Sequence, residues 1–340
     1  MCANRQKQIG LALQNYHDAY QGFPAGYGRL PRTVNSAGSG SRWGFSPHFF
    51  LLPFIEQVVV YDAGCIWGIS LDRSMDAQDT ADMSNPLARR MHHLECPSEM
   101  GSNPMPELPD NWSGRFGASN YVYSGADWQD AGHRQSVTFQ TNPRAAFSAH
   151  CGRENPIASY NFKALSDIID GTSNTVLLSE SCRGNGNTRL TKVGVAVSSG
   201  AVPVPTGTTL VTSARPQQCM ALTQGQEYSS SATISTNSFW KGGLWFHSIP
   251  LMNSFHTIMP PNGPTCLSGN DNWPNEVMKS ASSYHPGGVV CALFDASVRF
   301  VNDTVDTGDL NDFPVDSGPS PYGVWGALGS INGGESRELP

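Results

Sequence analysis

Apolar residues recur along residues 4–20 at the spacing of one helical face, i, i+3, i+4, i+7 and i+11. Gly22 and Pro24 come next, and glycine followed by proline is a common way for a helix to end. The pattern therefore predicts an amphipathic N-terminal helix. Its apolar face is formed by Ile9, Ala12, Leu13, Tyr16 and Tyr20.

Short apolar runs farther along the chain predict strands. Residues 118–128 alternate between apolar and polar side chains, and an apolar run at Val176–Leu178 follows a turn at Asp170 and Gly171. The apolar residues 289–294 follow a His-Pro-Gly-Gly turn and are typical of a buried strand. We expect this last strand to belong to a hairpin over 284–303.

The order of these elements predicts the fold class and its divisions. A second helix is expected within 47–64. Gly, Ser, Thr, Asn and Pro dominate residues 184–280, which indicates a loop-rich β insertion. One long helix followed by short strands is the order of an α+β fold, with the helix packed on an antiparallel sheet. We expect a core from 1–183 together with 281–316, the insertion 184–280, and an irregular tail over 317–340.

Composition limits the possible partners. Charged residues make up only 14% of the 340-residue chain, against roughly 25% in an average globular domain. The formal net charge is -7, and no cluster of Lys and Arg is present. Phosphate binding needs such a cluster, so the composition argues against nucleic acid as a partner.

Cysteine usage indicates the compartment. The eight cysteines are dispersed and none forms a C-x-x-C pair, which disfavours zinc ribbons and thioredoxin-like sites. An even number of dispersed cysteines fits disulfides in an oxidising compartment. No apolar run of about 18 residues is present. Because the chain opens as if in the middle of a helix, we expect that an N-terminal targeting segment has been removed.

No group of catalytic residues stands out. The stretch AGSGSRWG at 37–44 lacks the G-x-S-x-G spacing of serine hydrolases. His92 and His93 lie near Cys96, but outside the sequence frames that bind zinc. The residues therefore give no support for a hydrolase.

Acidic residues recur at every third position after the predicted hairpin. Calcium favours oxygen-rich loops of this kind, although the EF-hand frame fails because Pro314 stands where the bidentate acid belongs. The alternative is a solvated acidic loop. The residues are Asp303, Asp306, Asp309 and Asp312.

His285 and Asp295 flank the apolar run of the predicted hairpin and could be two halves of one site. Six strand residues span about 20 Å, however, so the two side chains lie at opposite ends of the strand. This distance is too long for a shared metal ion or proton. The spacing favours two polar residues that each shape a turn.

Three tryptophans lie within or near the loop-rich insertion. Trp240, Trp245 and Trp273 could form a flat platform on which the rings of a glycan stack. The alternative is that they are core residues of a loop-rich head.

Several stretches together resemble one bacterial family, that of domain of unknown function 1559. The N-terminal segment around Cys2 and Asn4 resembles its C-x-N-x-x-K-Q-I-G-L-A-L-x-N-Y-H-D pattern, and CPSE at 96–99 resembles its C-P-S-D. LLPFIEQ, SNY and MPPNGPTC also fit the family pattern. DGTSNTVLLSE resembles D-G-T-S-N-T-x-L-x-x-E, and the segment from 285 to 295 resembles the H-x9-D-G ending. The motif residues are Asp170, Gly171, Ser173, Asn174, Glu180, His285 and Asp295.

The resemblance implies a pilin-like or pseudopilin-like envelope protein rather than an enzyme. Its partners would be other pilin-like or secretion-system subunits, and its contact with the membrane would come only through a hydrophobic helix before Cys2. It also implies three disulfides: Cys2–Cys96, Cys219–Cys266 and Cys151–Cys182. By analogy with the major pseudopilins of type II secretion, Asp303, Asp306 and Asp309 become candidate Ca²⁺ ligands.

One position departs from the family pattern. Ala296 stands where the family usually has glycine. If the turn needs a positive φ there, alanine costs about 1 kcal/mol or more. The turn is therefore expected to differ in this chain.

Overall fold

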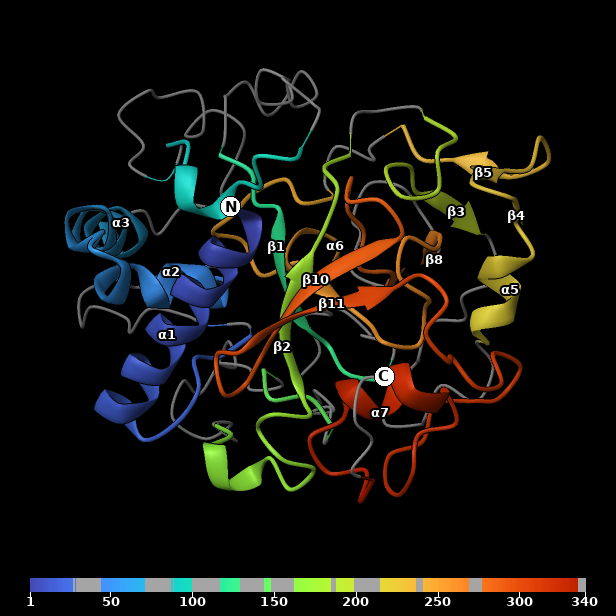
Figure 1. Ribbon diagram of the computed structural model, residues 1–340. Coiled ribbons are helices and arrows are strands. Elements are labelled where there is room, and N and C mark those ends of the chain that lie inside the picture. The colour runs from blue at the N-terminus through green and yellow to red at the C-terminus, as the bar shows by residue number, and fades with distance from the viewer. Residues whose placement is uncertain are drawn as a thin grey trace.

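The fold is α+β, as predicted. The computed structural model describes residues 1–26, 28, 44–70, 87, 89–99, 117–128, 144–147, 162–184, 188–198, 215–236, 241–268 and 277–335. Helices α1 to α3 lie on one flank of a central sheet, and a second, smaller sheet lies on the other flank (Figure 1). Within the described residues, no helix combines the length and the apolar character that a membrane span requires.

The central sheet has five strands in the order β11-β10-β2-β1-β7. Neighbouring strands are antiparallel except for the parallel pair β1 and β7. The predicted hairpin is confirmed as β10 and β11. The strands are β1 (Tyr121–Ser124), β2 (Val176–Glu180), β7 (Ser254–Phe255), β10 (Gly288–Leu293) and β11 (Val298–Asn302).

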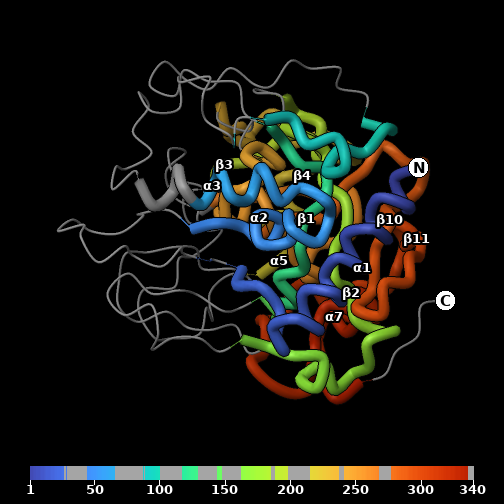
Figure 2. The backbone as a smooth tube through the Cα atoms, turned by 90° about the vertical axis from the view of Figure 1, so that its left-hand side faces the viewer, coloured from blue at the N-terminus to red at the C-terminus, as the bar shows by residue number. Residues whose placement is uncertain are grey.

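Helix α1 (Cys2–Tyr20) packs on this sheet against β10, β11 and β2 (Figure 2). Of the predicted apolar face, Ile9, Ala12 and Leu13 are buried and Tyr16 is partly buried, whereas Tyr20 is exposed. Gln21 ends the helix in a left-handed conformation at φ 58°. The core beside the helix includes Ile9, Leu13, Leu177 and Phe294. The predicted N-terminal amphipathic helix is thus confirmed, together with its packing on a sheet that is antiparallel except for one pair.

The second helix is broken into three pieces, contrary to the prediction of one helix within 47–64. They are α2 (Pro47–Leu51), the 3-10 helix η1 (Leu52–Ile55) and α3 (Val58–Ser70). The break follows Pro53, which cannot donate a helical hydrogen bond, and Glu56 adopts a left-handed conformation at φ 61°. The described residues also contain the 3-10 helices η3 (His92–Leu94) and η4 (Leu165–Asp167).

The insertion supplies a second sheet of four strands in the order β6-β3-β8-β9, with a separate hairpin of β4 and β5. It also supplies β7 to the central sheet. Its strands are β3 (Ala196–Ser198), β4 (Thr223–Gln224), β5 (Glu227–Tyr228), β6 (Thr233–Ile234), β8 (Thr265–Ser268) and β9 (Val277–Lys279), and its helices are α5 (Pro216–Met220) and α6 (Pro250–Asn253).

The tail was expected to be irregular, yet it contains helix α7 (Gly323–Gly329). The helix is short and rich in glycine, so its sequence gives it little intrinsic stability. Trp325 anchors it, because its side chain is fully buried and its Nε1–H donates to the carbonyl of Met259 at 2.8 Å.

The turn between β10 and β11 keeps a positive φ despite its alanine. Ala296 adopts φ 61°, and its N–H donates to the carbonyl of Leu293 at 2.9 Å. Asp295 closes the same turn by accepting the N–H of Ser297 at 2.8 Å. The expectation that the turn differs is therefore not supported, and Ala296 adopts the conformation that glycine favours.

Candidate functional site

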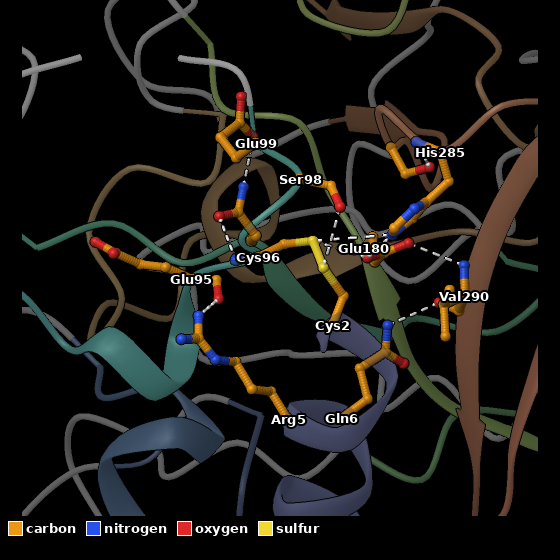
Figure 3. Close-up of a disulfide and its surroundings, with 12 residues drawn as sticks. Cys2, Arg5, Gln6, Glu95, Cys96, Ser98, Glu99, Glu180, His285 and Val290 are labelled. Carbon is orange, nitrogen blue, oxygen red and sulfur yellow. Dashed lines mark hydrogen bonds and ion pairs between the residues drawn. A yellow bond between two sulfur atoms is a disulfide. The ribbon is translucent and has the colours of Figure 1, made fainter. Parts of the chain in front are cut away.

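Four residues from distant parts of the sequence meet at the N-terminal end of α1 (Figure 3). Cys2 lies in the first turn of α1, Cys96 follows η3, Glu180 ends β2 and His285 precedes β10. One ligand atom from each lies within 4.8 Å of the others. In the described part of the chain, no other group of three or more His, Cys, Asp or Glu residues meets this distance.

Antiparallel pairing explains why Glu180 and His285 meet. In the β2–β10 pair, Ser179 lies opposite Cys291. The end of β2 therefore lies beside the start of β10, and the turn before β10 carries His285 to Glu180. His285 Nε2 lies 3.1 Å from Glu180 Oε1, although 105 residues separate them in sequence.

Cys2 and Cys96 form a disulfide, as predicted from the family resemblance. Their Cα atoms are 5.1 Å apart, and the bond joins residues 94 positions apart. A disulfide that closes a loop of this length lowers the entropy of the unfolded chain, which stabilises the folded state by about 4–5 kcal/mol. Asn120 Oδ1 accepts the N–H of Cys96 at 2.9 Å and so positions the segment that carries the second sulfur.

Glu180 is buried beside this disulfide. Its Oε2 accepts the backbone N–H of Val290 at 2.9 Å, and its Oε1 lies 3.3 Å from Cys96 Sγ. That second distance is a packing contact, because a disulfide sulfur carries no proton to donate. Burial raises the pKa of Glu180, while the Val290 N–H and His285 act in the opposite direction.

Helix α1 contributes further hydrogen bonds around the disulfide. Gln6 is fully buried, and its Nε2 donates to the carbonyl of Val290 at 2.9 Å. Arg5 donates to the carbonyl of Glu95, one residue before Cys96. The first turn of the helix is thus held by a covalent bond and by polar contacts to two different segments.

Chemically, the cluster combines a disulfide, a buried carboxyl and an imidazole. His285 is its most accessible member, with 24% of its side chain exposed, against 2% for Glu180. Cys96 Sγ lies 3.9 Å from His285 Nε2. The donor set of two sulfurs, one nitrogen and one carboxylate oxygen is also one that binds zinc once the sulfurs are thiolates.

The remaining motif residues lie at the opposite end of β2 and β10 and build turns. Both oxygens of Asp170 accept backbone N–H groups of the tail, from Gly333 at 2.6 Å and Gly334 at 2.8 Å. The N–H of Asp295 donates to the carbonyl of Thr172 at 3.0 Å, which joins the two turns. Gly171 has φ 96°, Asn174 donates its N–H to Gly171, and Ser173 is exposed.

His285 and Asp295 lie at opposite ends of β10, as the spacing predicted. The sequence did not reveal that the partners of His285 are Glu180 and Cys96. Each of the four clustered residues belongs to one of the stretches that resemble the family, and that shared membership was the available signal.

The structure does not bring the predicted calcium ligands together. Asp303 accepts a hydrogen bond from Asn262, while Asp306 and Asp309 each accept backbone N–H groups of their own loop. These three carboxylates are not among the clustered groups of the described residues. The calcium prediction therefore gains no support.

The prediction that Trp245 belongs to an exposed platform is wrong. Its side chain has no exposed surface, because it packs in the main core and its Nε1–H donates to the carbonyl of Arg89 at 3.1 Å. Trp240 and Trp273 lie outside the described residues. The core interpretation is therefore the correct one for Trp245.

The other disulfide predictions have different outcomes. Cys219 and Cys266 are bonded, which joins α5 to β8. Cys182 is a free buried thiol whose pKa burial raises to about 12, so its predicted bond to Cys151 is wrong. Cys151 itself lies outside the described residues. Two disulfides indicate an oxidising location, extracellular or in the cell envelope.

Comparison with protein families identifies a match over most of the chain. Residues 1–308 match the model of a family described as "Protein of unknown function (DUF1559)". No curated protein matches the chain, and no solved structure matches it either.

Proposed function

The chain belongs to the DUF1559 family, and we propose that it is a non-catalytic structural or assembly subunit of a pilin-like envelope or secretion system. The observation that carries the proposal is the attachment of α1 to the central sheet. The helix lies on β10, β11 and β2, and the Cys2–Cys96 disulfide joins its first turn to the segment that follows η3. We call the folded part of the chain beyond α1 the head. A helix held in this way can transmit force between its N-terminal end and the head without detaching.

The surface of α1 that faces away from the sheet supports an assembly role. This face is mostly polar, and its polar residues Asn4, Lys7, Gln8, Asn15 and Asp18 are all exposed. Leu11 lies in the middle of it with 48% of its surface exposed. An apolar residue framed by polar ones is a suitable contact for a helix of a neighbouring subunit.

The proposal includes an anchor that continues α1 before Cys2. The oxidising location fits a head domain displayed outside the cytoplasm, and the partners are then other pilin-like subunits. The native gene is expected to encode an apolar segment upstream of Cys2. A native gene that encodes no such segment would contradict the anchored form of the proposal.

Site-specific crosslinking in the native host tests the assembly role. Alanine first replaces the free thiols Cys65, Cys182 and Cys291 together with Cys151. A single reporter cysteine is then placed by Leu11→Cys on α1 or, as the matched control, by Gln224→Cys on the exposed β4–β5 hairpin. A short bismaleimide should link subunits through position 11 and not through position 224. Equal crosslinking at both positions, or none at position 11, contradicts the proposal.

The alternative of a glycan-binding module receives no support from the part of the chain that the structure describes. Its central residue, Trp245, has no exposed face on which a sugar ring could stack. We therefore propose no ligand for this surface.

A further inference from the structure

We propose that reduction of the Cys2–Cys96 disulfide converts the cluster into a site for one borderline divalent metal ion such as Zn²⁺, with Cys2, Cys96, Glu180 and His285 as its ligands. The inference goes beyond the assembly role and does not depend on it. In the oxidised chain the two sulfurs are bonded to each other, so neither can act as a thiolate ligand. The oxidised chain is therefore not expected to bind the metal ion at this site.

The chemistry of the donors suits zinc. Structural zinc sites use four ligands in a tetrahedron, drawn from cysteine sulfur, histidine nitrogen and carboxylate oxygen. The cluster offers two sulfurs, His285 Nε2 and Glu180 Oε1. A purely oxygen-binding ion such as Ca²⁺ or Mg²⁺ does not fit two thiolates.

Most of the geometry is already present. Zinc–ligand bonds of about 2.0–2.3 Å place the ligand atoms of a tetrahedron about 3.3–3.8 Å apart. The distances here are 3.1 Å from Nε2 to Oε1, 3.3 Å from Cys96 Sγ to Oε1 and 3.9 Å from Cys96 Sγ to Nε2. Cys2 Sγ lies within 4.8 Å of the other ligand atoms. The sulfur–sulfur distance must grow, and rotation of the two cysteine side chains after reduction can supply that change.

Neighbouring hydrogen bonds hold two of the ligands in place. The N–H of Val290 occupies Glu180 Oε2, which leaves Oε1 directed at Cys96 and His285. Asn120 fixes the backbone of Cys96. Outer hydrogen bonds of this kind orient metal ligands and usually raise the affinity of a site.

The redox step balances with a dithiol as the reductant. The dithiol attacks one sulfur of the disulfide and resolves to its own disulfide, so two electrons and two protons pass to Cys2 and Cys96. Both thiols then lose their protons as the metal–sulfur bonds form. In the reverse direction, a disulfide oxidant accepts the two electrons, the Cys2–Cys96 bond forms again and the metal ion is released.

Cobalt spectroscopy on the whole chain tests the proposal, since tetrahedral Co²⁺ bound to thiolates has intense visible and charge-transfer absorption. The protein carries alanine at Cys65, Cys151, Cys182 and Cys291, and it is reduced by a phosphine in the presence of Co²⁺. We expect one Co²⁺ per reduced chain, displaced by Zn²⁺, and no such absorption from the oxidised chain. His285→Gln should weaken Co²⁺ binding by at least about tenfold.

A matched pair of variants separates the proposed site from the other disulfide. Cys2→Ser/Cys96→Ser should abolish the thiolate absorption of this site, while Cys219→Ser/Cys266→Ser should retain it. If reduction unfolds the metal-free chain, Zn²⁺ should restore its melting transition, except in Cys2→Ser/Cys96→Ser. The proposal is overturned if the reduced chain binds no stoichiometric Co²⁺ and Zn²⁺ restores nothing. It is equally overturned if Cys2→Ser/Cys96→Ser binds as the parent does.

Discussion

Gly10 and Ala296 form a tight contact between α1 and the β10–β11 turn, and we predict that their effects on stability are coupled. A Cβ atom placed on Gly10 would lie 3.2 Å from the Cβ of Ala296 and 3.3 Å from its Cα. Ala296 holds φ 61° and is almost fully buried. The perturbations are Gly10→Ala, Ala296→Gly and the two together.

The magnitudes follow from opposing contributions. Gly10→Ala gains about 1 kcal/mol from helix propensity but adds a methyl to a filled contact, which costs about 1–3 kcal/mol. Ala296→Gly relieves about 1–2 kcal/mol of left-handed strain. The same substitution lowers the free energy of unfolding by about 0.8 kcal/mol, because a buried methyl group is lost. It lowers this free energy by about another 0.5–1 kcal/mol, because glycine gives the unfolded chain more conformational freedom. Gly10→Ala is therefore neutral or destabilising by up to about 2 kcal/mol. Ala296→Gly changes stability by less than about 1 kcal/mol in either direction.

In the double variant, the new methyl on residue 10 takes the space that the methyl of Ala296 leaves. Most of the overpacking cost disappears while the gain in helix propensity remains. We therefore expect the double variant to be more stable than the sum of the single changes predicts, by about 1–2 kcal/mol.

Urea unfolding of the four oxidised proteins measures this coupling energy directly. Gln8→Ala is the matched control, because it lies on the exposed face of α1 and should add to Ala296→Gly without coupling. If Gly10→Ala and Ala296→Gly also add to within about 0.3–0.5 kcal/mol, the packing argument is refuted.

Three further predictions concern buried polar groups. Burial lowers the pKa of His48 from its ordinary 6.5 to about 4, so the neutral form stabilises the fold fully above pH 6.5 and this contribution is lost as the pH falls toward 4. The urea concentration at the unfolding midpoint should fall as the pH is lowered from 6.5 to about 4, and it should fall less steeply in His48→Gln. If the two proteins give parallel curves of midpoint against pH, the pH dependence does not come from His48. Asp127 receives two hydrogen bonds from the guanidinium of Arg144 at 2.6 and 2.8 Å with both side chains fully buried, so Asp127→Asn should cost about 3–5 kcal/mol in the free energy of unfolding. A loss below about 1 kcal/mol would show that water replaces the ion pair. Asp170→Ala removes the carboxylate that accepts two backbone N–H groups of the C-terminal tail. A protease should then cut the tail faster, while the melting temperature of the core stays the same. An unchanged rate of cutting contradicts this role of Asp170.

The sequence alone determined the local elements whose patterns are strong. The period of apolar residues in 4–20 predicted α1, since a helical face needs only a repeat near 3.6 residues. The apolar run 289–294 gave both the strand β10 and the separation of His285 from Asp295. The family resemblance supplied the pairing of Cys2 with Cys96 and of Cys219 with Cys266.

Tertiary structure alone decided which distant residues meet. Glu180 lies beside His285 because β2 and β10 are antiparallel neighbours in a particular register, and no local pattern encodes that pairing. The burial of Trp245 and the formation of α7 likewise depend on contacts with segments far away in the sequence. Local preferences are set by neighbours along the chain, whereas a site assembled from four separate segments exists only once the sheet has brought them together.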